Sequence, residues 1–362
     1  YSFENVFQYN RGDLYWCTAD IGWITGHTYI IYGPLLAGAT TVMFEGVPTY
    51  PDAGRFWEIV EENKINIFYT APTAIRSLEA YGNEYVKKYD LESLKVLGTV
   101  GEPINEDAWN WYFKEIGGEK CPIVDTWWQT ETGGIMISNL AGINKAKPTF
   151  ATLPLPGIKA CIVDENGDEL ETYNIEGKLC VKYPWPSMAR TIYGDHQRFI
   201  DTYFSSFAGK YFSGDGCYKN EEGLFRITGR VDDVLIVSGH NLGTAEIESA
   251  IDEHKNVCES AIVGYPHTIK GNGIFAYIIC HSSPKDKKAT GIEINDLITK
   301  HVGPIAKVDK FLYVEGLPKT RSGKIMRRIL RKIASGEFNE LGDTSTLLDP
   351  NVVTSIIKES QK

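Results

Sequence analysis

Between residues 53 and 128, segments with the apolar spacing of a helix alternate with short apolar runs typical of buried strands. The helices are predicted within 54–64 and at 72–81 and 105–116, and the strands at 65–70, 94–100 and 123–126. Helix–strand alternation with short breaks predicts βαβ units and a parallel sheet. Ligands of such sheets bind beyond the carboxyl ends of the strands. Two breaks fall there: Gly101-Glu102-Pro103, and the segment 127–134.

Two further regions follow along the chain. Residues of about 150–228 contain short predicted strands at 159–163, 178–182 and 225–228, with a hairpin turn signal at Asn166-Gly167. Beyond residue 231 a new pattern predicts strands 234–237, 260–263, 274–280 and 310–314 and helices 245–253, 293–300 and 325–335, with Thr244 as N-cap. One hydrophobic core stops growing near roughly 250–300 residues, so the 362 residues are divided here into domains 1–231 and 232–362.

Charge and cysteine content exclude several classes of protein. Lys and Arg number 37 against 47 Asp and Glu, a net charge of −10, which argues against nucleic-acid and membrane-surface binding. The seven cysteines are scattered without a C-x-x-C pair, which argues against a zinc ribbon. This cysteine usage favours a reducing, cytoplasmic location, and a nuclear or organellar pool stays open. No apolar run reaches about 18 residues, so no membrane span is predicted. The missing initiator Met favours a fragment.

Four ordered segments carry a family resemblance: D-T-W-W-Q-T-E-T-G-G at 125–134, Y-F-S-G-D-G at 211–216, the segment 229–240 that opens G-R-V-D-D, and P-K-T-R-S-G-K at 318–324. The sequence resembles the AMP-forming acyl-CoA synthetases of the acyl-adenylate-forming superfamily, over nearly all of its length. The resemblance implies an α/β fold with a large N-terminal adenylation domain, built of parallel sheets and a β-rich subdomain and truncated here. A smaller, mobile α+β C-terminal domain would follow a hinge at Asp232.

The reaction implied by the resemblance has two steps. A carboxylate attacks the α-phosphate of MgATP to give an acyl-adenylate and pyrophosphate, and the thiol of coenzyme A then displaces AMP. The first step joins two anions and needs charge neutralisation and positioning. Lys324 corresponds to the catalytic lysine, and Asp232 to the residue about which the C-terminal domain rotates between the steps. The alternative for Lys324 is a solvated or polyanion-binding face, because residues 319–332 hold seven cations and no acid.

Other positions correspond to the nucleotide site of the family. Asp215 would accept both ribose hydroxyls, with Arg230 assisting, because a carboxylate offers two acceptor oxygens; a plain Gly-Asp-Gly turn is the alternative. Asn241 stands where the family has an Arg that contacts phosphate, so a charged fork is lost. The remaining members of the expected nucleotide site are Gly101, Glu102, Pro103, Asp125, Thr126, Trp127, Trp128, Gln129 and Thr130.

Two cation sites are implied. Glu131 corresponds to a residue that helps hold Mg²⁺ on the phosphates, an oxygen-ligand role suited to a hard cation. Without that context it would be an ordinary exposed acid. Asp252, His254 and Val257 correspond to a backbone-carbonyl cation site, although a histidine such as His254 is more often an ordinary helix-end residue.

The acyl group and coenzyme A complete the expected site. The indole of Trp128 corresponds to the pocket wall of family members that use acetate; such a wall excludes longer acids, whereas a missing methylene costs only about 1–3 kcal/mol. Acetate is therefore expected, with some use of propionate. Ile24, Thr25 and Val100 would form the other walls, or are simply core residues at strand ends. Coenzyme A contacts are expected from Thr25, Thr49, Ser238, Gly239 and Thr299, where Thr49 and Thr299 replace the usual Asn and Arg.

The expected activity is thus the conversion of acetate, ATP and coenzyme A into acetyl-CoA, AMP and pyrophosphate. Acetylation of Lys324 would remove its charge, which makes a deacetylase a candidate partner. The Gly-, Ser- and Thr-rich phosphate loop of the family is not found between residues 1 and 362, so the chain alone is expected to be inactive. The alternatives are an inactive binding module, a ligase for propionate or other acids, and a dehydrogenase, which the lack of a G-x-G-x-x-G segment disfavours.

Overall fold

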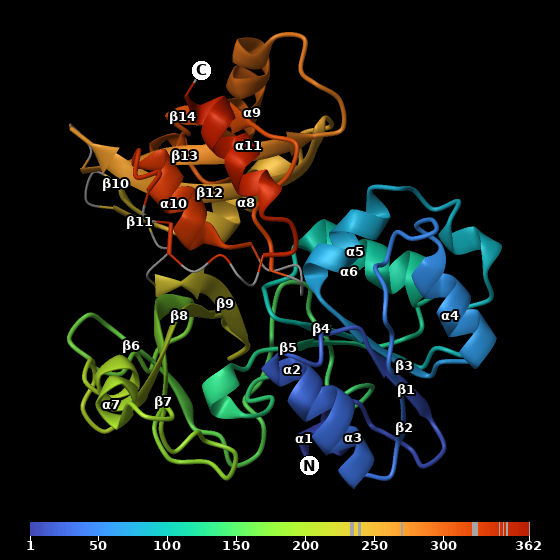
Figure 1. Cartoon of the computed structure of the whole chain (residues 1–362). Coiled ribbons are helices and arrows are strands. Elements are labelled where there is room, and N and C mark those ends of the chain that lie inside the picture. Colours follow the sequence, from blue (N-terminus) through green and yellow to red (C-terminus); the bar gives the residue numbers. More distant parts are fainter. Residues whose placement is uncertain are drawn as a thin grey trace. The chain divides into compact units, whose positions relative to one another are not determined.

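A computed structural model describes residues 1–231, 235–237, 240–268, 271–320, 325–339, 341–342, 344 and 347–361 (Figure 1). For residues 236, 240 and 241 only the backbone is described. Contacts divide the chain into two compact units, Tyr1–Thr228 and Gly229–Lys362. The sequence-based boundary lies a few residues further along, and it stays a prediction together with the hinge at Asp232, which is outside the described residues.

The first unit contains a five-stranded parallel sheet in the order β2-β1-β3-β4-β5. Its strands are β1 (Leu14–Cys17), β2 (Thr40–Val42), β3 (Ile67–Thr70), β4 (Val96–Val100) and β5 (Ile123–Thr126). The predicted parallel sheet is confirmed. Thr99 lies opposite Asp125 and Val100 opposite Thr126, so β4 and β5 end at the same level. The two breaks that follow them therefore leave one edge of the sheet.

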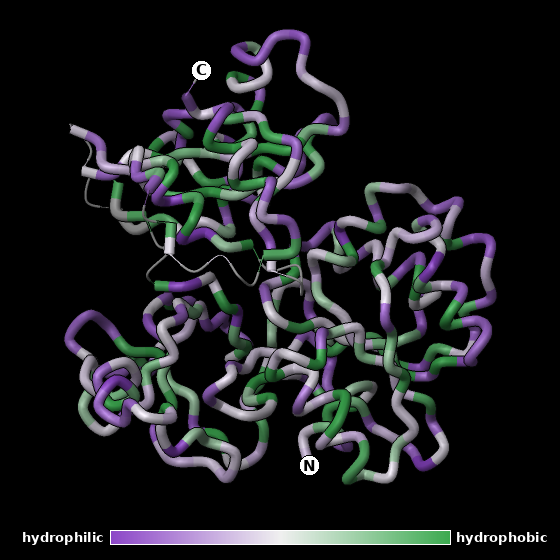
Figure 2. The backbone as a smooth tube through the Cα atoms, viewed as in Figure 1, coloured by the Kyte–Doolittle hydropathy of each residue, from purple (hydrophilic) through white to green (hydrophobic). Residues whose placement is uncertain are grey.

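Helices cover both faces of this sheet. On one face, α4 (Arg55–Asn63), α5 (Pro72–Glu79) and α6 (Glu106–Trp111) share a buried cluster with Phe68 and Leu97. On the other face, α1 (Ser2–Val6) packs in a cluster that includes Tyr69 and Val124. Successive strand residues point to opposite faces, so all of β3 is buried. Figure 2 shows hydrophobic residues along the strands and hydrophilic residues on the outer loops.

Two segments of the first unit are π-helical. One is η1 (His27–Tyr32), between α2 (Ile24–Gly26) and α3 (Gly33–Leu36), and the other is η3 (Tyr112–Ile116), which continues α6. The helix predicted at 105–116 is therefore confirmed, with a change of pitch near its end. No element was predicted before residue 53, because three- and four-residue strands and a π-helical turn produce neither the strand nor the α-helix period. A short 3₁₀ turn, η2 (Val86–Lys88), precedes β4.

The rest of the first unit forms a four-stranded sheet in the order β6-β7-β8-β9. The elements are β6 (Ala160–Val163), β7 (Ile175–Val181), α7 (His196–Tyr203), β8 (Tyr211–Lys219) and β9 (Phe225–Arg230). The turn predicted at Asn166-Gly167 is present: the Asp164 side chain accepts from the Asn166 backbone N–H, and Gly167 has φ +89°. The alternative that Asp215 is a turn residue is wrong. It lies within β8, after Gly214 at φ +74°, where the pairing with β7 shifts register.

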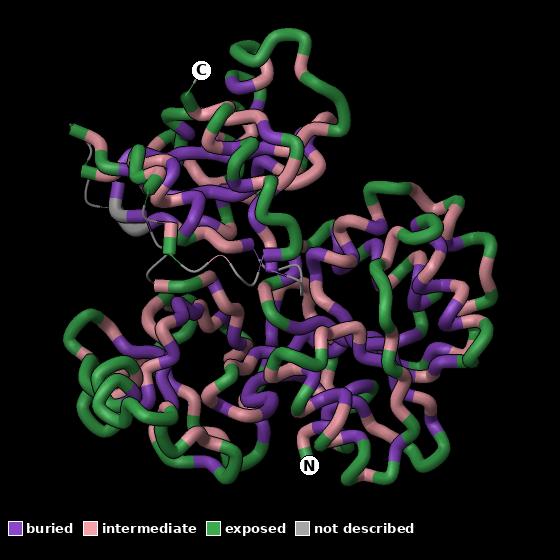
Figure 3. The backbone as a smooth tube through the Cα atoms, in the orientation of Figure 1, coloured by how far each residue is buried: buried purple, intermediate pink, exposed green. Residues whose placement is uncertain are grey.

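The second unit is a sheet in the order β11-β10-β13-β12, with β14 parallel to β13. Helices α8 and α9 pack on one face, and α10 and α11 on the other. The elements are β10 (Leu235–Val237), β11 (His240–Leu242), α8 (Thr244–Asp252), β12 (Val257–His267), β13 (Gly271–Cys280), α9 (Lys287–His301), η6 (Pro304–Ala306), β14 (Lys310–Tyr313), α10 (Arg327–Ala334) and α11 (Asn351–Ser360). Figure 3 shows the strands mostly buried and the loops exposed.

Some details predicted for the second unit are wrong. Thr244 is the first residue of α8, and Gly243, with extended backbone, is the N-cap. Helix α9 begins at Lys287 rather than at residue 293, after Asp286, whose side chain caps two backbone N–H groups. Thr290 and Gly291 have low helix propensity and hid this first part of the helix. Strand β12 runs on through Pro266 to His267, although proline usually ends a strand.

The structure describes the state of the cysteines and the character of the helices. All seven cysteines are free, and five of them are buried. Burial raises the pKa of Cys17 to about 12 and that of Cys161 to about 11. No helix among the described residues combines the length and the apolar character that crossing a membrane requires.

The N-cap of α6 provides a test of the fold next to the break after β4. The Asn105 side chain accepts the backbone N–H of Ala108 at 3.3 Å. Asn105→Ala removes this acceptor and should lower the free energy of unfolding by about 1 kcal/mol, whereas Asn105→Asp should stay within a few tenths of a kcal/mol because Asp caps equally well. Urea denaturation measures both variants. Equal midpoints for the two substitutions would show that the cap contributes nothing.

Candidate active site

The break after β4 is held by α5. Gly101 has φ +97°, which favours glycine and turns the chain sharply at the end of the strand. The Glu102 carboxylate then forms an ion pair with Arg76 at 2.8 Å and accepts a hydrogen bond from the Thr73 hydroxyl. Gly101 and Pro103 on either side are exposed. This loop is therefore anchored through Glu102, while its neighbours remain accessible to a ligand.

The side chain of Gln129 links the loop after β5 to the β6-β7-β8-β9 sheet of the first unit. Its side-chain amide donates to the Ser213 carbonyl at 2.7 Å and to Asp215 Oδ2 at 2.9 Å. The Tyr211 hydroxyl donates to Gln129 Oε1 at 2.9 Å. The loop continues through a 3₁₀ turn, η4 (Thr130–Thr132), where the Gln129 backbone N–H donates to Thr132 Oγ1 at 2.9 Å. One side chain thus links the parallel sheet to β8.

Asp215 is buried, with 6% of its surface exposed. Besides Gln129, its Oδ2 accepts the indole N–H of Trp127 at 3.0 Å, and its own backbone N–H donates to Ser213 Oγ at 3.1 Å. A buried carboxylate needs such donors, because an uncompensated charge in the interior is costly. The structure therefore brings together three residues predicted for the nucleotide site: Trp127, Gln129 and Asp215. Thr130, next in the loop, is exposed.

Trp128 is held by two buried tyrosines. The ring of Tyr29, from η1, meets the indole edge-on with centroids 5.0 Å apart. The indole N–H donates to the Tyr69 hydroxyl at 3.4 Å, and that hydroxyl bonds Thr126 Oγ1 at 2.6 Å. Val100 belongs to the same apolar cluster. Ile24 and Thr25 are half-buried in α2; within the described part of the chain, neither is a member of that cluster.

Asp125 faces β4 rather than solvent. It is 7% exposed, and its Oδ1 accepts the Thr99 hydroxyl at 2.7 Å. Burial raises the pKa of this carboxyl to about 6, and the Thr99 hydrogen bond offsets only part of the shift. Thr126 donates to the Thr99 carbonyl at 2.8 Å. Both predicted nucleotide residues therefore also stabilise the ends of β4 and β5.

Glu131 is the residue predicted to help hold Mg²⁺. It is half-buried, and its Oε1 accepts the hydroxyl of Tyr203 in α7. A carboxylate in this setting fits the cation, because Mg²⁺ prefers oxygen ligands and is usually held by one or two carboxylates plus phosphates. Among the described residues, no cluster of three or more His, Cys, Asp or Glu side chains could hold a metal ion by itself. A site here would thus depend on substrate oxygens.

The second predicted cation site lies after α8. His254 is 7% exposed and its Nε2 is 3.0 Å from Glu293 Oε2. The His254 carbonyl accepts the Val257 backbone N–H at 2.8 Å, and Asp252 Oδ1 accepts the Ser260 hydroxyl at 2.7 Å. These contacts account for His254 as a residue of the helix-to-strand turn. The cation site stays a prediction.

Several predicted site residues are not placed in this network. Lys324, Asp232, Ser238 and Gly239 lie outside the described residues, as does the side chain of Asn241, whose backbone lies in β11. Arg230 ends β9, Thr49 lies in a turn after β2, and Thr299 lies in α9, where its hydroxyl donates to the Asn295 carbonyl at 2.7 Å. Their binding roles stay predictions.

Two described cations of the basic run at 319–332 form ion pairs. Lys319 pairs with Glu259 at 2.6 Å, and Arg327 pairs with both carboxylate oxygens of Glu248 at 2.6 and 2.8 Å. Both acids are 12% exposed at the side chain. Acids from other elements therefore neutralise two of the seven cations in this run, and the solvated or polyanion-binding face stays an open alternative for Lys324.

Four tyrosines that hold the site were assigned no role from the sequence. Tyr29 and Tyr69 fix the indole of Trp128, and Tyr203 and Tyr211 bond Glu131 and Gln129. Tyr69 and Tyr211 could have been suspected, because one lies near the end of a predicted strand and the other begins a matched motif. Tyr29 and Tyr203 lie in elements that no sequence period predicted.

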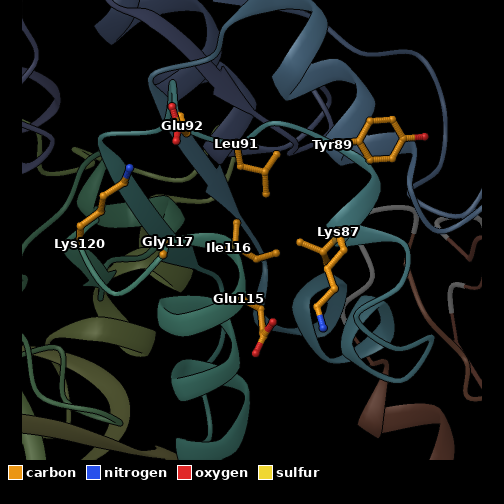
Figure 4. Close-up of a pocket in the computed structure, with 10 residues that line it drawn as sticks. Lys87, Tyr89, Leu91, Glu92, Glu115, Ile116, Gly117 and Lys120 are labelled. Carbon is orange, nitrogen blue, oxygen red and sulfur yellow. The ribbon is translucent and has the colours of Figure 1, made fainter.

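A cleft of about 310 Å³ opens elsewhere on the first unit (Figure 4). Its lining residues are Val86, Lys87, Tyr89, Leu91, Glu92, Glu115, Ile116, Gly117, Gly118 and Lys120. These segments lead into β4 and β5, so the cleft lies at the amino ends of the strands. It is therefore separate from the candidate site at their carboxyl ends.

The raised pKa of Asp125 predicts a pH-dependent stability. The folded chain keeps the Asp125 proton up to about pH 6, whereas the unfolded chain loses it near pH 4. Unfolding free energy should therefore fall as pH rises between these values, and Asp125→Asn should abolish this contribution. From about pH 4.5 to 7.5 the variant should gain about 2 kcal/mol relative to the wild type, as measured by urea denaturation at each pH. Parallel pH profiles would contradict the prediction.

Two family models match the chain. Residues 1–193 match the AMP-binding enzyme family, and residues 246–324 match the AMP-binding enzyme C-terminal domain. Curated proteins named acetyl-coenzyme A synthetase are 58% identical over 362 residues in Sinorhizobium medicae and Rhizobium meliloti, and 57% identical over 360 residues in Brucella anthropi. These alignments cover 99% of the chain and 55% of each relative. The chain thus spans about half the length of the curated relatives it matches.

A solved structure shares the fold. The crystal structure of the anthranilate CoA ligase AuaEII in complex with anthranoyl-AMP superposes with a TM-score of 0.80 at 24% identity, covering 92% of this chain and 61% of that one. The resemblance drawn from the four motifs and the α/β fold it implied are both confirmed. The chain belongs to the AMP-binding enzyme family.

Proposed function

We propose that this chain supplies the acid- and nucleotide-binding residues of an acetate–CoA ligase, which forms acetyl-CoA, AMP and pyrophosphate through an acetyl-adenylate. The observation that carries the proposal is the single loop after β5, which contacts the Asp215 carboxylate through Trp127 and Gln129 and carries the Trp128 indole. A nucleotide and a small acid bound to this loop would be held beside each other. The curated relatives named acetyl-coenzyme A synthetase support the same activity.

In this proposal Asp215 accepts the ribose hydroxyls, with Arg230 assisting, and the loops at 101–103 and 125–130 line the nucleotide. The donors on Asp215 Oδ2 support this role, because they hold the carboxylate in a fixed orientation. The anchoring of Glu102 by Arg76 likewise supports a fixed surface for the base. Preorganised groups of this kind cost no reorganisation when the reaction occurs.

Trp128 limits the size of the acid. Its indole is packed against Tyr29 and bonded to Tyr69, both fully buried, so moving it would displace two rings of the core. Protein interiors are close-packed and resist such displacement. A ligase for propionate is the alternative, because one additional methylene is a small difference for a wall of this kind.

The remaining roles rest on the resemblance. Lys324 would neutralise charge during adenylation, Asp232 would act as the hinge, and Thr25, Thr49, Ser238, Gly239 and Thr299 would contact coenzyme A. Glu131 would contribute a carboxylate to Mg²⁺, which neutralises phosphate charge when bound. Gly229, at the boundary of the units, has φ +119°, a conformation other residues rarely adopt. Asn241 and Thr299 are uncharged where the family has Arg, so weaker binding of ATP phosphate is expected at Asn241 and weaker binding of coenzyme A at Thr299.

An inactive binding module of the same fold is the second candidate, since Asn241 and Thr299 are uncharged where the resemblance implies Arg. A cytoplasmic location belongs to the proposal and is supported by seven free cysteines. A deacetylase acting on Lys324 would be the partner that restores its charge.

Separating the two half-reactions tests the proposal. The vehicle is a chimaera in which these 362 residues replace the aligned part of a curated relative. It should exchange pyrophosphate into ATP only with acetate present, and release AMP only after coenzyme A is added. Lys324→Ala should lower the exchange by about 100-fold or more, yet still transfer the acetyl group from supplied acetyl-adenylate. Production of ADP and phosphate would refute the ligase, and equal loss of both steps would refute the role of Lys324.

The indole of Trp128 can be tested in the same chimaera. Trp128→Gly should enlarge the pocket and shift preference toward acids of four to six carbons, because the proposed wall is removed. Relative kcat/KM values for acetate and the longer acids measure the shift. Trp109→Gly, a tryptophan of α6 in the opposite core cluster, is the control and should leave the preference unchanged. If kcat/KM rises for none of the acids longer than acetate, Trp128 is only a core residue.

A further inference from the structure

We propose that Tyr203 and Tyr211 are positioning residues that orient the two carboxylates of the nucleotide site, Glu131 and Asp215. The inference rests on the proposed function, because it assigns Glu131 to the cation and Asp215 to the ribose. Neither tyrosine would touch the reacting atoms. Each acts through one hydrogen bond to a residue of the loop after β5.

A continuous series of contacts joins the two carboxylates. Glu131 Oε1 accepts the Tyr203 hydroxyl, and the ring of Tyr203 stacks on that of Tyr211 with centroids 5.2 Å apart and an interplanar angle of 12°. The Tyr211 hydroxyl donates to Gln129 Oε1 at 2.9 Å, and Gln129 Nε2 donates to Asp215 Oδ2 at 2.9 Å. The stacked rings therefore set the positions of both hydroxyls at once.

The surroundings keep this stack in place. Tyr211 is 2% exposed and meets Trp185 edge-on at 5.2 Å. Phe199, in the same helix as Tyr203, lies 5.6 Å from its ring. The loop is also fixed from its other side, because the Trp185 indole N–H donates to the Thr132 carbonyl at 2.9 Å. The hydroxyls are thus presented from rigid aromatic packing rather than from mobile side chains.

The Tyr211 hydroxyl helps to hold the Gln129 amide in one orientation, together with the two acceptors of the NH₂ group. An amide presents an oxygen on one side and an NH₂ on the other. Because a hydroxyl donates to the oxygen, the NH₂ faces Asp215 and Ser213. Without that hydroxyl, Gln129 Oε1 loses the hydrogen bond that holds this side of the amide, and the side chain is freer to rotate away from Asp215. The Asp215 carboxylate would then be held less firmly in the position proposed to bind the ribose.

The Tyr203 hydroxyl has a different effect. It occupies one oxygen of Glu131 and so restricts the rotation of a side chain that would otherwise sample several rotamers. The donor is a neutral hydroxyl, so it brings no opposite charge that would compete with a cation for the carboxylate. Partners that orient a metal-binding group in this way typically contribute 10- to 100-fold to affinity or activity. The two hydroxyls should therefore affect different steps: Tyr203 the dependence on Mg²⁺, and Tyr211 the affinity for the nucleoside.

The experiment uses Tyr→Phe substitutions, which keep the rings and remove the hydroxyls. Tyr218→Phe is the matched control: it lies in the same strand as Tyr211, and its hydroxyl bonds Asn174. AMP binding to the 362-residue chain is measured by calorimetry. Tyr211→Phe should weaken it by about tenfold, which corresponds to about one hydrogen bond, whereas Tyr203→Phe and Tyr218→Phe should leave it unchanged.

Two readouts follow Glu131. In chain labelled with ¹³C at the glutamate carboxyls, the Glu131 resonance is the one that disappears in Glu131→Gln, and Tyr203→Phe alone should move it. In the chimaera, Tyr203→Phe should raise the Mg²⁺ concentration for half-maximal ATP–pyrophosphate exchange by about tenfold. Wild-type binding and exchange with no change in either variant would overturn this inference alone. Absence of AMP binding and of exchange in the wild type would overturn the proposed function, and this inference with it.

Discussion

The side-chain amide of Gln129 joins the two sheets of the first unit, and the candidate site depends on this junction. It provides donors to the Ser213 carbonyl and to the buried Asp215 carboxylate of β8 from a loop that follows β5. A carboxylate with 6% of its surface exposed requires such donors. The position of the loop and the position of the Asp215 carboxylate are therefore coupled, and neither sheet alone would define the site.

Much of the fold follows from local patterns. The alternation between residues 53 and 128 was sufficient to predict a parallel sheet and the edge at which its loops meet, because buried strands and amphipathic helices have distinct periods. The same reasoning failed for η1 and for α7. A π-helical turn has neither period, and α7 combines one buried residue, Phe199, with largely exposed neighbours. Thr244 was misplaced as a cap because Gly243 can take the same extended conformation without a side-chain acceptor.

Only part of the site could be predicted from the sequence. Motifs identified Asp215, Trp128 and Glu131, since their spacing is local, but not the residues that hold them. Tyr29 is separated from Trp128 by about a hundred positions, and Tyr203 from Glu131 by 72. Such contacts depend on how sheets and helices pack, and the local spacing of apolar residues does not predict that packing. The ion pairs of Lys319 and Arg327 are of the same kind, because their partners Glu259 and Glu248 lie in other elements.

The burial of the cysteines has a chemical consequence for a protein proposed to hold an activated acyl group. A mixed anhydride reacts readily with thiolates, and only the thiolate form of cysteine is strongly nucleophilic. Cys17 ends β1 at the same edge of the sheet as the candidate site, yet it is 2% exposed and burial raises its pKa to about 12. At neutral pH its sulfur remains protonated and shielded. Burial thus keeps the Cys17 thiol from accepting the acyl group, so an external thiol would not compete with a cysteine of this strand.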